Sequence, residues 1–422
     1  MASQDSFRRV LHLLRHNPDY RRLFLATVVS LLGDWFAFVA ISGFVTEVTG
    51  RPGSAAAVYA ASVLPAFLLS PVAGLIADRV DRKRLMVAVD LLRVLPALGL
   101  LASLHWRSPV LAITCVGLLA ALSSFFDPVA EASVPNVVAP EDLSLAQAAL
   151  GSVWGTMLFI GAAVGGLATI AFGREVSFVL NAATFLLSAG LVWGIRRPLQ
   201  HHGAPQAEGA WAQLGEVWTL ARQSHLTRSL LVTKAGVGLG NGIVGLLPAF
   251  AAGRFAAGDV GVGTLLAARG LGALIGPFLG QRWAGDDGRR ILFVCGGSMV
   301  SYGLAYALLP LAPTLHLAAV CVLLAHLGGG AQWVLSTYGL QVSTPDGMRG
   351  RVLGLDFGLA TLAVGVSSLA AGGAAEVFGL AAASWGLAGV SLVYGAWWLW
   401  WTRRLWRGPV DVLAASQPRQ SG

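Results

Sequence analysis

The stretch "GLIADRVDRKR", Gly74 to Arg84, places four basic and two acidic side chains in its last seven residues. Apolar sequence flanks it on both sides, "SAAAVYAASVLPAFLLSPVA" before and "LMVAVDLLRVLPALGLLASL" after. Each flank is close to the ~20 residues that a helix needs to cross a ~30 Å hydrocarbon layer. The stretch therefore indicates a tight turn between two membrane-spanning helices.

The composition extends this interpretation to the whole chain. Hydrophobic residues make up 55% of the 422 residues and charged residues 12%, against about a quarter charged in a soluble domain. We predict an all-α integral membrane protein with twelve transmembrane helices. The predicted spans are residues 23–48, 55–76, 85–105, 109–126, 147–172, 176–195, 229–252, 260–280, 291–311, 315–336, 352–376 and 380–402.

The basic residues indicate the orientation of these spans. With the N-terminus in the cytoplasm, 22 of the 29 lysines and arginines lie in cytoplasmic segments, four lie in outer loops, and Arg93, Lys234 and Arg269 lie within spans. This bias predicts a multi-pass protein of the inner cell membrane with both termini cytoplasmic. The bases do not gather on one soluble face with aromatic residues between them, so we expect no nucleic-acid partner.

The chain divides into two similar halves. We expect an amphipathic cytoplasmic segment over 1–22, a six-helix half over 23–195, a cytoplasmic linker over 196–228, a second six-helix half over 229–402 and a tail over 403–422. The turn at Gly74 is echoed by "GQRWAGDDGRR" at Gly280, and "APEDLSLAQAAL" at Ala139 by "TPDGMRGRVLGL" at Thr344, both about 205 residues later. Parallel repeats of this kind are typical of secondary transporters.

These motifs resemble the major facilitator superfamily. Its signature between spans two and three runs Gly, any, Leu, Ala, Asp, Arg, any, Gly, Arg, Lys. The chain matches it with Gly74, Ile76, Ala77, Asp78, Arg79, Arg82 and Lys83. Asp81 departs from the family glycine. The stretches "YRRLFLATVVSLLGDWF" and "FFDPVAEASVPNVVAPEDL" further resemble the branch of enterobactin exporters and macrolide efflux proteins.

The resemblance implies a conformational latch. In the superfamily, the acid that matches Asp78 lies against the N-terminus of the eleventh span and holds the halves together while the carrier faces outward. Gly74 would allow a close approach of the two spans, and Asp356 would be a partner for Arg79 or Arg82. The alternative is a solvated turn whose bases only hold it at the cytoplasmic surface.

Ionised groups inside the spans are candidate functional residues, because they are costly there unless they face a partner or a wet cavity. Asp34, near the middle of span one, is either a proton site or substrate contact, or a structural residue that makes an ion pair or a hydrogen bond between helices. Arg269, at a similar depth, would bind an anionic substrate or pair with Asp34. Lys234 is close enough to the cytoplasm to extend its amine to the surface. Asp90 and Arg93 are three residues apart and are expected to pair.

Two uncharged polar residues are further candidates for the substrate cavity. Asn241 and Gln332 fall in spans seven and ten, which the family fold places on the cavity wall. We expect a monomeric, proton-coupled exporter of small amphipathic or apolar molecules, of drug, macrolide or siderophore type, working by alternating access. The alternatives are a lysolipid or metabolite carrier and a transport-dead sensor.

Enzymatic activity is not expected. The eight histidines form no metal-ligand spacing, no nucleophile has a base near it in the sequence, and a GxxxxGK[ST] phosphate loop is missing. We therefore predict no cofactor and no metal site, with protons, the lipid bilayer and a small-molecule substrate as the partners.

Overall fold

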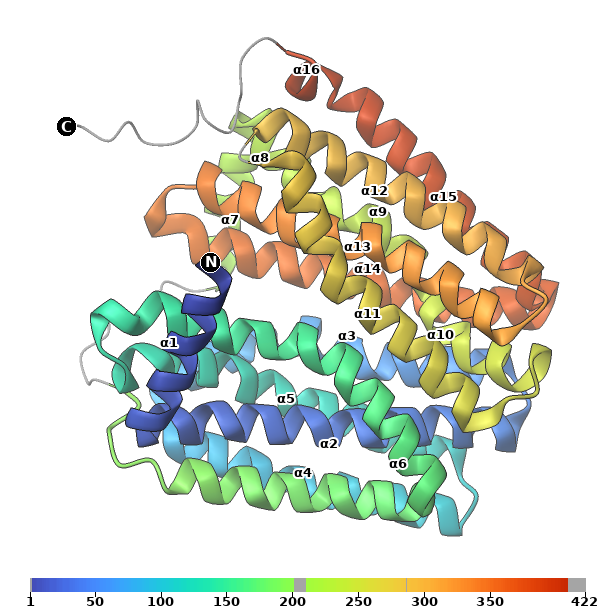
Figure 1. Cartoon of the computed structure of the whole chain (residues 1–422), viewed down its shortest axis with the longest axis horizontal. Coiled ribbons are helices and arrows are strands. Elements are labelled where there is room, and N and C mark those ends of the chain that lie inside the picture. The colour runs from blue at the N-terminus through green and yellow to red at the C-terminus, as the bar shows by residue number, and fades with distance from the viewer. Residues whose placement is uncertain (1, 201–209, 286, 409–422) are drawn as a thin grey trace.

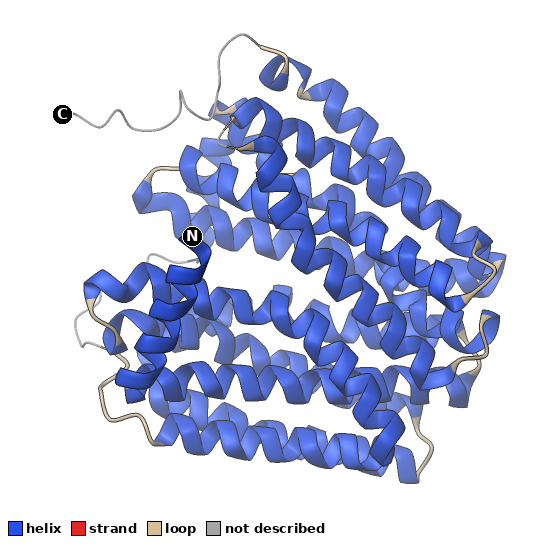
Figure 2. Cartoon of the chain, in the orientation of Figure 1, coloured by secondary structure: helices blue, strands red, loops and turns tan. Residues whose placement is uncertain are grey.

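The computed structural model describes residues 2–200, 210–285 and 287–408, and Figure 2 shows this part of the chain as helices joined by short loops. The elements before the linker are α1 Ala2–His16, α2 Pro18–Thr49, α3 Pro52–Arg79, α4 Arg82–His105, α5 Pro109–Val137, η1 Pro140–Asp142 and α6 Leu143–Trp193. Those after it are α7 Ala210–Gln223, α8 His225–Leu231, α9 Thr233–Gly240, α10 Gly242–Ala249, η2 Phe250–Arg254, α11 Gly258–Ala284, α12 Gly288–Leu308, η3 Leu309–Leu311, α13 Leu315–Ser343, α14 Asp346–Phe378, α15 Leu380–Trp401 and α16 Arg403–Trp406.

Twelve membrane crossings follow from eleven long apolar helical segments. Helix α6 has 51 residues, which at 1.5 Å per residue is about 75 Å, more than twice the hydrocarbon thickness. Gly173 interrupts it with φ 82° and ψ 168°, a conformation that glycine reaches without steric cost. The break lies between the predicted spans 147–172 and 176–195, so the all-α, twelve-span fold is confirmed.

Several helices are longer than the spans predicted from hydropathy. Helix α2 begins at Pro18 instead of residue 23, because the Asn17 side chain caps it by accepting a hydrogen bond from the Tyr20 amide at 3.0 Å. Helix α5 continues to Val137, eleven residues beyond the predicted end. Hydropathy marks only the apolar part of a helix, whereas backbone hydrogen bonding continues beyond it.

The bundle has two distinct ends. Helices α1 and α7 lie at one end, called the α1 end, and the Gly173 bend and the connection from η2 to α11 lie at the other, called the Gly173 end (Figure 1). Residues 201–209 and 409–422 of the predicted linker and tail lie outside the described residues. Helix α7 lies within the predicted linker.

The two halves meet mainly through α3 with α10 and α14, and through α6 with α11. Glycines bring these backbones together at the Gly173 end. A Cβ atom on Gly263 of α11 would come within 3.1 Å of the Cα of Gly166 of α6, and one on Gly372 of α14 would come within 2.9 Å of the Cα of Gly53 of α3. The halves are therefore in direct backbone contact there.

The seventh span is discontinuous and is the most deeply buried of the spanning segments described. It consists of α8, α9, α10 and the π-helical η2. The helix is interrupted at Val232, between α8 and α9, and at Asn241, between α9 and α10. Broken helices are tolerated inside a membrane only where other protein segments or a cavity surround them. This break places the Asn241 side chain at the boundary between the halves.

Candidate functional site

Arg93 is the centre of a charged cluster inside the first half. Its side chain is 1% exposed and donates to Asp90 Oδ1 at 3.3 Å and to Ser30 Oγ at 3.0 Å. The guanidinium lies between the rings of Phe126 and Phe185, 5.1 and 5.2 Å from their centroids. The predicted pairing of Asp90 with Arg93 is therefore confirmed, and the ion pair and the two rings position this arginine, while its Nε has no hydrogen-bond partner among the described residues.

Asp34 and Asp127 add two carboxylates to this cluster. Both lie near enough to Arg93 to interact with its charge directly. Within the described part of the chain, neither makes a hydrogen bond or an ion pair. Asp34 is half-buried and Asp127 is exposed. Arg93 thus has one ion-pair partner, Asp90, and two further carboxylates in its vicinity.

The predicted pairing of Asp34 with Arg269 is wrong. The nearby positive charge for Asp34 is Arg93 of α4, and Arg269 of α11 lies instead against Tyr59 of α3. Similar depth in the membrane does not bring two residues together, because their helices also have to face each other.

Arg269 belongs to a second polar network, which joins the two halves. Its Nη2 donates to the Tyr59 hydroxyl at 3.0 Å, and Asn241 Nδ2 lies 3.5 Å from the same oxygen. The Tyr302 hydroxyl donates to Asn241 Oδ1 at 2.9 Å. Tyr59 is the contribution of the first half, while the other three residues come from α11, the α9–α10 break and α12 of the second half.

Lys234 and Asp356 form an ion pair inside the second half. They lie on α9 and α14, are 3% and 1% exposed, and Lys234 Nζ also donates to Thr337 Oγ1 at 2.8 Å. Lys234 therefore does not extend to the surface. Asp356 is paired with Lys234, so the expected pairing of Asp356 with Arg79 or Arg82 is wrong.

Gln332 also lies in the interior of the second half. It is fully buried on α13, and its Nε2 donates to the carbonyl oxygen of Thr233 at 2.5 Å. This hydrogen bond joins α13 to the first residue of α9, directly after the interruption of the seventh span at Val232. The contact of Gln332 with substrate that the sequence suggested remains a prediction.

The charged turn is fixed to its own half. Arg82 donates to the carbonyl oxygens of Ala132 and Leu199 at 2.7 and 3.2 Å, and Lys83 to that of Ile195 at 2.7 Å. Asp81, in place of the family glycine, caps α4 by accepting from the Arg84 amide at 2.8 Å.

The other predicted members of the latch are less defined. Arg79 is exposed at the end of α3. The backbones of Gly74 and Asp78 lie in α3, but the surroundings of these two residues lie outside the described part of the structure. The latch therefore stays a prediction for Asp78.

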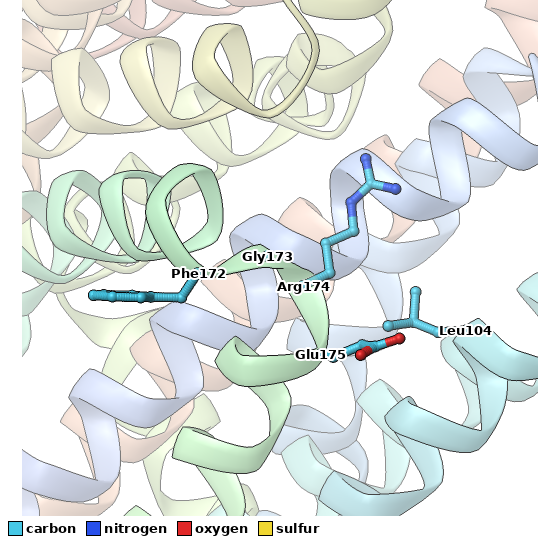
Figure 3. A pocket seen from close by; sticks show the side chains of 5 residues that line it. All are labelled: Leu104, Phe172, Gly173, Arg174 and Glu175. Carbon is cyan, nitrogen blue, oxygen red and sulfur yellow. The ribbon is translucent and has the colours of Figure 1, made fainter.

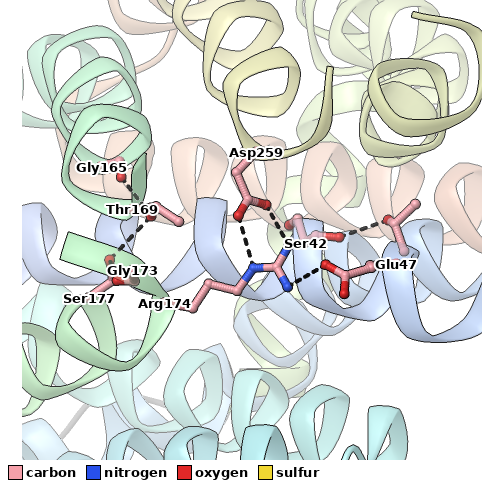
Figure 4. Close-up of polar contacts among 9 residues, drawn as sticks. Ser42, Glu47, Gly165, Thr169, Gly173, Arg174, Ser177 and Asp259 are labelled. Atoms are coloured by element: carbon pink, nitrogen blue, oxygen red, sulfur yellow. Dashed lines mark hydrogen bonds and ion pairs between the residues drawn. The ribbon is translucent and has the colours of Figure 1, made fainter. Parts of the chain in front are cut away.

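An ion pair closes the Gly173 end between the halves (Figure 4). Arg174, directly after the Gly173 bend, binds both carboxylate oxygens of Asp259, with Nε–Oδ2 and Nη2–Oδ1 distances of 2.9 Å. Its Nη1 also donates to Glu47 Oε2 at 2.7 Å. Asp259 belongs to α11, whereas Arg174 and Glu47 belong to α6 and α2, so only the pair with Asp259 links the two halves.

A small hollow of about 320 Å³ lies beside this bend, lined by Leu104, Phe172, Gly173, Arg174 and Glu175 (Figure 3). The Arg174 side chain points away from Glu175 toward the other half. The hollow is at the Gly173 end, distant in sequence from the mid-span carboxylates. It is therefore a feature of the closed end of the bundle.

Sequence reasoning missed two groups of residues. Asp127 was omitted because the predicted fourth span ended at residue 126, and a helix extended by one turn would have included it. Tyr59 and Tyr302 carried no signal, because a tyrosine in an apolar run is usually a packing residue. Their role depends on the approach of Arg269 and Asn241 from distant segments.

Comparisons with known proteins agree with this fold. A family described as transmembrane secretion effector matches residues 13–406. The chain is 26% identical over 360 residues to the multidrug efflux pump Tap of Mycobacterium tuberculosis, covering 82% of this chain and 84% of Tap. It is 23% identical over 345 residues to the putative bacilysin exporter BacE of Bacillus subtilis, covering 80% and 84%.

Other similarities are shorter or structural. The MFS-type transporter YfiS of Bacillus subtilis is 27% identical over 202 residues, 47% of this chain and 48% of YfiS. A bacterial homologue of the human lysosomal transporter Spinster superposes with a TM-score of 0.71 at 14% identity, covering 96% of this chain and all of that one. The nucleoside transporter NupG gives 0.67 at 12% identity, covering 90% and 99%. These structures share the fold.

Proposed function

Because the chain belongs to the transmembrane secretion effector family of the major facilitator superfamily, it is a membrane transporter and not an enzyme, and we propose that it is a proton-coupled exporter of small amphipathic molecules. It works by alternating access as a monomer in the inner cell membrane, with the α1 end in the cytoplasm. The observation that supports the proposal is the environment of the Asp34 carboxyl group.

The position and surroundings of Asp34 support a coupling role. Helix α2 is 32 residues long, about 48 Å, and Asp34 lies at its middle. Its carboxyl group is half-buried and, within the described residues, has no hydrogen-bond partner, while Arg93 supplies a fixed positive charge nearby. A carboxyl group with these properties can bind and release a proton during each transport cycle without loss of a structural contact.

Alternating access is supported by the distribution of contacts between the halves. The ion pair of Arg174 with Asp259 and the close glycine contacts lie at the Gly173 end. Asp127, by contrast, is exposed although it lies well inside α5. We interpret this arrangement as a carrier closed on its outer side. Export by relatives such as Tap supports the same direction of transport here.

The experiment is transport by purified protein in proteoliposomes with an imposed pH gradient, using ethidium and N-dansyl-leucine as a cationic and an anionic probe. Asp34→Asn should abolish uphill transport driven by the gradient but retain exchange down a probe gradient. Asp90→Asn is the contrasting variant, because it removes the paired carboxylate and should lower the melting temperature.

Three results would contradict the proposal in different ways. Full gradient-driven transport by Asp34→Asn would refute the coupling role. A loss of heat stability in Asp34→Asn as large as that in Asp90→Asn would make Asp34 a structural residue. Transport of neither probe under any gradient would favour the lysolipid carrier or the transport-dead sensor.

A further inference from the structure

Arg269 differs from the other two basic residues inside the spans. Arg93 is paired with Asp90 and Lys234 with Asp356. Arg269 is equally enclosed, with 7% of its surface exposed, yet within the described residues it has no carboxylate partner. A buried cation without a counter-charge is strongly unfavourable. Its presence therefore requires either a structural benefit or an anion that binds there during transport.

The hydrogen bonds around Arg269 leave donors in excess. The Tyr59 hydroxyl accepts from Arg269 Nη2 and faces Asn241 Nδ2, and within the described residues its own proton has no acceptor. Arg269 Nε is buried without any partner. Asn241 Oδ1, the acceptor of the group, is occupied by the Tyr302 hydroxyl. The guanidinium of Arg269, the hydroxyl of Tyr59 and the amide of Asn241 thus bring together more hydrogen-bond donors than acceptors. Such an arrangement is typical of a binding site for an oxyanion.

The helix carrying Arg269 is held rigidly in this position. Gly270 leaves no room for a side chain against Leu158 and Phe159 of α6, and Gly272 packs in the same way against α13. The guanidinium is therefore fixed between the first half and the rest of the second half. A site held by rigid elements loses little entropy when a ligand binds.

We propose that Arg269, Tyr59 and Asn241 bind an acidic group of the transported molecule, a carboxylate or a comparable oxyanion. This inference rests on the proposed transport function and defines its substrate class: amphipathic molecules that carry an acidic group. The ligand would accept from the Nε and Nη groups of Arg269 and from the Tyr59 hydroxyl. Because Tyr59 and Arg269 lie on opposite halves, the bound anion replaces their mutual hydrogen bond and links binding to the separation of the halves.

The test compares two probes that differ only in charge. Purified full-length protein in detergent is titrated with N-dansyl-leucine, which carries a carboxylate, and with N-dansyl-leucinamide, which does not, and fluorescence anisotropy reports binding. The natural chain should bind the acid about tenfold more tightly than the amide, as expected for a charge-assisted bidentate contact. Arg269→Gln should reduce this preference to less than about threefold, and Tyr59→Phe should reduce it partly.

Arg254→Gln is the matched control. Arg254 belongs to the same half, is exposed and, among the described residues, donates to the carbonyl oxygen of Ala312, so its replacement should preserve the preference. Binding in detergent requires no gradient, so the preference is measured independently of coupling. Failure of gradient-driven transport and failure of acid recognition are therefore separate results.

Heat stability gives a readout that needs no ligand. If Arg269 serves an absent anion, Arg269→Gln removes an uncompensated charge and should leave the melting temperature of the unliganded protein unchanged or higher. A clear fall in that temperature would show that the guanidinium is structural. Equal binding of acid and amide by the natural chain, or binding of neither, would also overturn the proposal.

Discussion

The pair of Arg174 with Asp259 offers a direct test of alternating access, because it joins the halves at one end only. Replacing Asp259 with Asn keeps the size of the side chain but removes the charge and one acceptor of the bidentate contact. The carrier should then open more often at the Gly173 end. Glu47→Gln is a matched control, since Glu47 contacts the same arginine from within the first half.

The magnitude follows from the geometry. Both contacts are 2.9 Å long and charge-assisted, and the two side chains are 20% and 19% exposed. Hydrogen bonds to charged groups contribute about 1.5 to 3 kcal/mol, and exposed ion pairs at most about 1 kcal/mol. For this partly exposed pair we expect about 1.5 kcal/mol, which corresponds to a roughly tenfold change in the ratio of closed to open molecules.

The assay is a distance measurement between nitroxide labels by double electron–electron resonance. Cysteines introduced at Arg51 and Gly253 are suitable, because both positions are exposed and belong to opposite halves. Arg51 follows Glu47 in the connection from α2 to α3, and Gly253 of η2 precedes Asp259. The native cysteines Cys115, Cys295 and Cys321 are first replaced by alanine. Asp259→Asn should add a population at longer distance, and Glu47→Gln should resemble the parent protein.

Two results would refute this reasoning. An unchanged distance distribution in Asp259→Asn would mean that the pair does not stabilise closure. An equal change in Glu47→Gln would mean that the effect comes from the position of Arg174 and not from the link between the halves.

Three further predictions concern the remaining charges and the topology. Lys234→Met should leave the buried Asp356 carboxylate without a counter-charge and lower the free energy of unfolding by about 3 to 5 kcal/mol. The double variant with Lys234→Met and Asp356→Leu should recover most of this loss in a thermal-unfolding assay. Asp78→Asn should remove an interaction of about 0.3 to 2 kcal/mol with a helix N-terminus and favour opening at the α1 end; unchanged cysteine accessibility at that end would refute the latch. Reporters fused near His201 and at the C-terminus should both indicate the cytoplasm, and an external signal at either site would contradict the orientation.

The fold could be predicted from sequence because its determinants are local. The length of an apolar run between charged turns is a property of consecutive residues, and so is the position of Gly173 next to Arg174 and Glu175. Asp90 and Arg93 were paired correctly for the same reason, since residues three apart on a helix lie on one face.

Partners from distant segments could not be derived in this way. Lys234 and Asp356 are 122 positions apart, and their pairing depends on how α9 and α14 are rotated against each other. The depth expected from the sequence put Asp34 and Arg269 at the same level in the membrane, but it gave no information about which helices are neighbours. The site at Tyr59 could not be predicted for the same reason, because it forms only where α3, the α9–α10 break, α11 and α12 meet.

The glycine contacts at the Gly173 end have a consequence for how often the carrier can cycle. Gly166 against Gly263 and Gly53 against Gly372 bring backbones together without interlocking side chains. Where two glycines meet, no side chain has to leave a fitted pocket when the halves part. These glycines therefore determine how closely the backbones approach, whereas the preference for the closed state depends on other residues, such as Arg174 and Asp259. The glycine contacts can form and break repeatedly. The stability of the closed state depends instead on a few charged residues, which can be substituted one at a time.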